Sequence, residues 1–169
     1  FTGIYGLGDY FPLAFAAIAI GIAAAGLLNS RIVGRFGMRV ISHGALTGSV
    51  VISMLTLLAA WQGWLSFPVY MVLAIGTMFA FGLMFSNFTA LAMEPQGHIA
   101  GTASSLFGSI TTLIGSGVGA LIGQDFNGTM LPFATGAFLC TLAALAVVLV
   151  VERGRLFVPH NAVVPTPPR

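Results

Sequence analysis

The chain has 169 residues, of which 57% are hydrophobic and only 6% are charged, and its formal net charge is +2. This composition excludes a soluble globular protein, in which about a quarter of the residues are charged. It also excludes a disordered chain, because disordered chains are polar and poor in aromatic residues.

Five apolar stretches are long enough to cross a membrane as helices, since a spanning helix needs about 20 mostly apolar residues. They cover residues 11–28, 40–60, 69–93, 102–122 and 130–151. Pro68 favours a helix start beside the third stretch, and Pro95 ends that stretch because proline cannot continue the helical hydrogen-bond ladder. Residues 152–169 end in a proline-rich segment and are predicted to form a cytoplasmic, disordered tail. The predicted fold class is an all-α membrane protein.

The arginines lie in two clusters that predict the orientation of the chain. Arg31, Arg35 and Arg39 lie between the first and second stretches, and Arg153 and Arg155 follow the fifth. Basic residues in short loops stay on the cytoplasmic side of a membrane. Four stretches separate the clusters, so five crossings place both clusters on that side. We therefore predict a multi-pass membrane protein with its N-terminal end outside and its tail in the cytoplasm.

The first and fourth stretches carry small residues that share one helix face. In the first stretch the face contains Gly21, and in the fourth it contains Gly108, Gly115, Gly119 and Gly123. Such faces let helix backbones approach each other closely in lipid. Two interpretations stay open, since the faces could form static packing contacts or contacts that slide against another bundle.

The third stretch holds the strongest polar group at membrane depth, Asn87, close to Phe81, Met84 and Phe85. A buried amide in lipid needs a partner, because leaving it unpaired costs a few kcal/mol. Asn87 could therefore hydrogen-bond to a neighbouring helix. Alternatively, the four residues could line a cavity, and this mixture suits apolar, weakly polar or cationic ligands.

Glu94 lies at the inner end of the third stretch, at the unfavourable negative end of the helix dipole. We expect it to pair with Arg35 or Arg39 in an inner-side charge network. His43 and His98 are interpreted as interfacial residues rather than proton relays.

No sequence motif indicates catalysis. Ser116 in a Gly-Ser-Gly segment would need an activating histidine on a neighbouring stretch, and the fourth and fifth stretches contain none. We predict no enzymatic activity, no cofactor and no metal site. Nucleic acid is not an expected partner either, because the chain has no basic patch with interleaved aromatic residues.

Two segments resemble a known family. The run from Asn87 to Ser105 resembles the tenth and eleventh helices of major facilitator superfamily multidrug efflux transporters, with the Bcr/CflA-like drug:proton antiporters as the closest subgroup. The run from Asn29 to Arg39 resembles the second-half copy of the superfamily's G-x-x-x-D-R-x-G-R-R loop. Three residues of this loop match and three depart from it, including Gly34 where the family has aspartate.

The resemblance implies that the five stretches correspond to helices 8–12 of a twelve-helix fold. It implies a C-terminal fragment of a secondary transporter in a bacterial inner membrane, which exports drugs or other small amphipathic molecules by proton antiport and alternating access. The implied partners are the small-molecule substrate, the proton, the lipid bilayer and the absent N-terminal half. The alternative is a non-transporting membrane subunit that packs with a partner complex through the fourth stretch.

Overall fold

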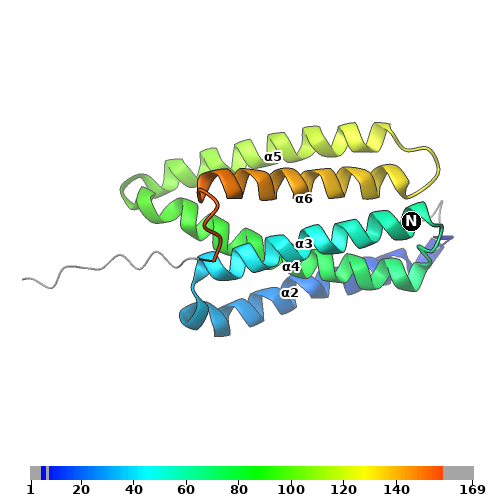
Figure 1. Ribbon diagram of the computed structural model, residues 1–169, viewed down its shortest axis with the longest axis horizontal. Coiled ribbons are helices and arrows are strands. Elements are labelled where there is room, and N and C mark those ends of the chain that lie inside the picture. The colour runs from blue at the N-terminus through cyan, green and yellow to red at the C-terminus, as the bar shows by residue number, and fades with distance from the viewer. Residues whose placement is uncertain (1–4, 7, 158–169) are drawn as a thin grey trace, which may run out of the picture.

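The computed structural model describes residues 5, 6 and 8–157. In chain order the elements are the short 3-10 helix η1 (Gly8–Tyr10), α2 (Phe11–Phe36), α3 (Met38–Trp61), α4 (Phe67–Met93), the 3-10 helix η2 (Glu94–Ile99), α5 (Ala100–Gln124) and α6 (Leu131–Val151). No strand occurs in this part of the chain, which confirms the all-α prediction. Figure 1 shows α5 and α6 on one side of the bundle and α2 on the other, with α3 and α4 between them.

Four helical segments have the length and apolar composition of membrane spans: Gly8–Phe36, Met38–Trp61, Phe67–Gln124 and Leu131–Val151. The third has 58 residues, far more than the roughly 20 that one crossing needs. It bends at η2, where Gln96 leaves helical geometry with φ −103° and ψ 15°. The chain is a multi-pass membrane protein, and the count of five crossings stays a prediction.

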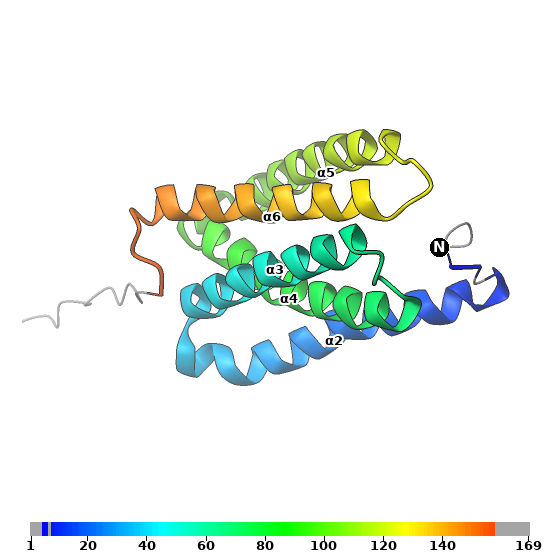
Figure 2. The same ribbon diagram turned by 45° about the vertical axis from the view of Figure 1, so that its right-hand side comes forward.

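Both arginine clusters lie at the same end of the bundle. Figures 1 and 2 place the α2–α3 turn, η2 and the end of α6 at one end, and the α3–α4 and α5–α6 connections at the other. This arrangement is the one that the charge pattern requires, because Arg35 precedes the α2–α3 turn and Arg153 follows α6.

Helix α2 is longer than the predicted first stretch, which ended at residue 28. The helix continues through Arg31 and Arg35 to Phe36, and the chain reverses at Gly37 with φ +80°. Arginine lowers hydropathy but is a good helix former, so the apolar stretch ends before the helix does. The other four long helices begin and end within two residues of the predicted ranges.

Helices α2 and α4 approach each other through small residues. A Cβ atom on Gly21 would lie only 2.6 Å from the carbonyl oxygen of Ile75, and one on Gly82 would lie 2.8 Å from the Cβ of Ala25. Ala25 and Leu83 join Ile41 and Ala45 of α3 in the buried cluster beside this contact. At Gly21 and Gly82, α2 and α4 therefore approach each other with almost no side-chain volume between them.

Helix α6 packs on α3, and α5 is held less firmly. The hydroxyls of Ser53 and Thr141 lie 2.8 Å apart across the α3–α6 contact. In contrast, α5 contains no buried residue. Its side chain Ile122 reaches α6, where a Cβ on Gly136 would meet Ile122 at 2.6 Å.

Replacement of Gly21 by leucine should loosen the α2–α4 contact. The new side chain would meet the Ile75 backbone, which cannot move aside as a flexible side chain would. We expect a loss of about 1–3 kcal/mol in the free energy of unfolding, measured by denaturation of the purified protein in detergent. Gly26→Leu is the matched control on the same helix, because no atom lies within 4 Å of that position. Equal stability of the two variants would contradict the contact.

Candidate functional site

Asn87 lies in the contact between α4 and α2. Its side-chain nitrogen donates one hydrogen bond to the Oδ1 of Asn29, at 2.7 Å, and another to the carbonyl oxygen of Leu83, at 2.8 Å. The residue is only 1% exposed. Asn87 has no free surface through which to contact a substrate in this conformation. The bond to Asn29 is the interhelical hydrogen bond that the first of the two interpretations of Asn87 expected.

The other three residues of the predicted cavity lie elsewhere on α4. Phe81 and Phe85 are 45% and 53% exposed, and their rings stack with centroids 5.7 Å apart and planes 26° apart. Met84 is half-buried and packs against the cluster around Leu83. The structure thus separates the four predicted residues into a buried amide, an exposed aromatic pair and a methionine that packs against the core cluster.

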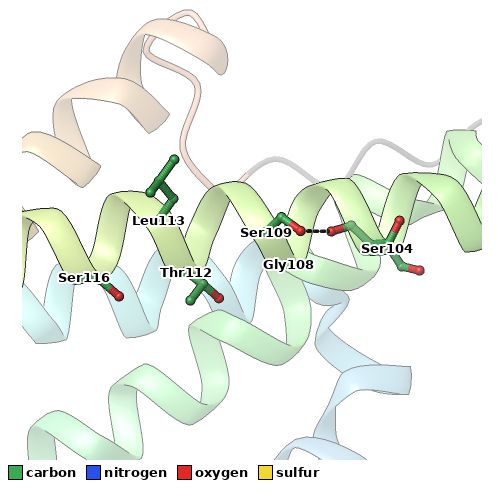
Figure 3. Close-up of a pocket in the computed structure, with 7 residues that line it drawn as sticks. Ser104, Gly108, Ser109, Thr112, Leu113 and Ser116 are labelled. Atoms are coloured by element: carbon green, nitrogen blue, oxygen red, sulfur yellow. Dashed lines mark hydrogen bonds between the residues drawn. The ribbon is translucent and has the colours of Figure 1, made fainter.

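The glycine face of α5 is covered by no described part of the chain. A Cβ atom on Gly108, Gly115, Gly119 or Gly123 would find no atom within 4 Å. Figure 3 shows serine and threonine side chains on this side of α5, around a shallow hollow. The hollow is lined by Ser104, Ser105, Gly108, Ser109, Thr112, Leu113 and Ser116. Glycines and hydroxyl residues together form what we call the α5 face.

Most hydroxyls of the α5 face bond to their own helix. Ser104 and Ser105 donate to carbonyl oxygens of the preceding turn at 3.0 Å, and Ser109 donates to the carbonyl of Ser105 at 2.8 Å. Such bonds satisfy the hydroxyl groups internally. The face is therefore uncharged, and few of its hydroxyl groups are left to hold a neighbouring helix in a single register.

The ion pair at the arginine-bearing end of the bundle differs from the predicted network, in which Glu94 pairs with Arg35 or Arg39. Arg39 Nη1 donates to both carboxylate oxygens of Glu152 at 2.8 Å. Within residues 8–157, Glu94 is exposed and forms no ion pair, and the guanidinium of Arg35 lies over the ring of Phe36 at 5.7 Å. Glu152 becomes the partner because α6 packs on α3, which brings the end of one helix to the start of the other.

His43 lies near the start of α3 and is buried within the protein, where the segment after α6 covers it. It is 2% exposed, and its Nδ1 accepts a hydrogen bond from the backbone N–H of Phe157 at 3.1 Å. The two rings meet edge to face with centroids 5.9 Å apart. Residues 152–157 thus lie folded against α3, which corrects the disordered-tail prediction for this part. Residues 158–169 lie outside the described residues.

Comparison with known proteins identifies two similar proteins. The chain is 32% identical over 143 residues to a bicyclomycin resistance protein homolog of Haemophilus influenzae, a match that covers 81% of this chain and 35% of that protein. It is 30% identical over 132 residues to an uncharacterized MFS-type transporter of Bacillus subtilis, covering 73% and 31%. The resemblance to the major facilitator superfamily is confirmed.

The chain spans about a third of the length of these major facilitator relatives. No protein-family profile matches it. No solved structure matches it either.

The Asn29–Asn87 bond can be measured by a double-mutant cycle. We expect Asn29→Ala and Asn87→Ala to be coupled by about 1 kcal/mol in the free energy of unfolding, the scale of an interhelical hydrogen bond in membrane proteins. Ser86→Ala combined with Asn29→Ala is the control, because Ser86 bonds to Gly82 of its own helix. Additive effects in the Asn29–Asn87 cycle would show that the bond contributes nothing to stability.

Proposed function

We propose that this chain is the C-terminal portion of a secondary active transporter that exports drugs or other small amphipathic molecules across a bacterial inner membrane. The observation that carries the proposal is the uncovered α5 face, which suits contact with a second helical bundle. The name of the Haemophilus influenzae relative, a bicyclomycin resistance protein homolog, supports a drug as substrate.

Alternating access requires one bundle to rock against another around a central site. The α5 face suits such a moving contact, because its glycines allow close approach and its serine hydroxyls bond to their own helix. The α2–α4 contact has the opposite character, since the Asn29–Asn87 bond and the close backbones hold it in one register. We infer that this bundle moves as a unit and that its α5 face slides against a second bundle.

Phe81 and Phe85 are the proposed substrate contacts. Their stacked, half-exposed rings offer an aromatic surface to apolar or cationic groups, and Met84 beside them adds an adaptable thioether. We propose that these rings face the central cavity of the assembled transporter.

Proton antiport is the proposed coupling. The acidic residues that the structure describes, Asp9, Glu94, Asp125 and Glu152, all lie outside helices α2–α6. Acids inside membrane helices usually form proton paths. We therefore assign proton coupling to a part of the transporter beyond this chain.

Gly119→Leu tests the sliding contact in cells that express the full-length polypeptide. Gly119 lies at the centre of the α5 face, and a leucine there would hold two bundles apart, so we expect export to fall by about tenfold or more. Gly117→Leu is the matched control, because Gly117 lies two residues away and therefore on the opposite side of the helix. Drug efflux is measured at equal membrane abundance. Full export by Gly119→Leu would refute the contact, and no export by the parent protein would favour the non-transporting subunit.

Phe85→Ala tests the substrate wall in the same cells. Because the ring is already 53% exposed, its removal should leave stability nearly unchanged. We expect export of amphipathic cations to change by about threefold or more, the scale of one lost aromatic contact. Phe133→Ala on α6, where the ring is 50% exposed, should leave export unaltered. Equal export profiles for both variants would remove Phe85 from the site.

A further inference from the structure

An apolar groove opens between α2, α3 and α4, with a volume of about 460 Å³. Its lining includes Ile32 and Phe36 of α2, Gly44 and Gly48 of α3, and Phe79 of α4. Gly44 and Gly48 are one turn apart, and a Cβ atom at either position would find no atom within 4 Å. Because these two positions carry no side chain, the groove stays open along α3.

The groove has the length of one membrane leaflet. Its lining on α3 runs from Val40, near the start of the helix, to Ile52, which corresponds to about 18 Å at the rise of an α-helix. Half of a bilayer hydrocarbon core is about 15 Å thick. The groove therefore extends from the arginine-bearing end of the bundle to the depth of the bilayer centre.

A positive charge without an acidic partner lies beside this groove. The guanidinium of Arg35 lies 5.7 Å from the ring centroid of Phe36, which lines the groove. Arg35 is exposed and forms no ion pair with any residue from 8 to 157. Arg39, by contrast, is neutralised by Glu152. The groove thus combines an apolar lining with a cation at one end that has no acidic partner among residues 8–157.

We propose that this groove binds one phospholipid with an anionic headgroup. One acyl chain lies over Gly44 and Gly48, and the phosphate meets Arg35 at the membrane surface. A phospholipid supplies in one molecule both the apolar chain that the lining fits and the negative charge that Arg35 attracts. Basic residues beside grooves between membrane helices are suited to anionic headgroups, to which each arginine adds electrostatic attraction.

The test uses the full-length polypeptide in nanodiscs with equal amounts of phosphatidylglycerol and phosphatidylcholine of the same acyl chains. Native mass spectrometry then counts the lipids that stay bound after extraction. We expect phosphatidylglycerol to be retained in preference to phosphatidylcholine. Arg35→Gln should reduce that preference by about fivefold, the effect of one arginine near an anionic surface. Gly48→Leu should remove retention of both lipids by filling the groove.

Two matched controls accompany these variants. Arg155→Gln removes another exposed arginine at the same end of the bundle, and Gly26→Leu adds the same side chain at an open position outside the groove. Both should retain phosphatidylglycerol like the parent. Unchanged retention in Gly48→Leu, or equal retention of the two lipids by the parent, would overturn the proposal. Displacement of the lipid by inorganic phosphate would do so too, since it would indicate an anion site without an acyl chain.

Labelling distinguishes lipid from polypeptide in the groove even if Gly48→Leu folds poorly. A phosphatidylglycerol that carries a diazirine in one acyl chain is added to the intact membrane and illuminated. We expect it to crosslink to residues 40–52 of α3, which line the groove. The absence of any crosslink to these residues would show that no acyl chain lies in the groove, and would overturn the proposal.

Discussion

Lipid surrounds these helices with an environment as apolar as their own side chains, so hydrophobic burial cannot hold the bundle together. Close backbone approach and polar contacts have to do so. The α2–α4 contact combines both, with Gly21 against the Ile75 carbonyl and Asn87 bonded to Asn29. Helix α3 packs beside this pair, and α6 packs on α3 through Ser53 and Thr141. Every other feature of the molecule is positioned by this group of four helices.

Small residues serve two different purposes in this chain. On α2 they close a contact within the bundle, where a side chain at Gly21 would collide with the backbone of α4. On α5 they leave a face open, and on α3 Gly44 and Gly48 open a groove. The same residue type thus marks a fixed contact, an uncovered face and a lipid-sized hollow. Only the neighbours of each glycine distinguish the three.

The arginine-bearing end of the bundle is held together by an ion pair and by the chain after α6. Arg39 pairs with Glu152, and the next residues fold over His43 as far as Phe157. This arrangement leaves Arg35 as a cation without an acidic partner in the described chain. Arg35 lies before the α2–α3 turn and is available to an anionic ligand. Arg39 lies after the turn and is already paired with Glu152.

Composition and charge alone determined that the chain is an all-α membrane protein and that its arginine clusters share one end, because apolar stretches of about 20 residues cross lipid as helices and arginine must reach water. The run from Asn87 to Ser105 was enough to indicate the family. Tertiary structure decided that Asn87 faces Asn29, that Glu152 rather than Glu94 pairs with Arg39, and that His43 is buried. These contacts join residues as far as 114 positions apart, and nothing local encodes which helix packs on which.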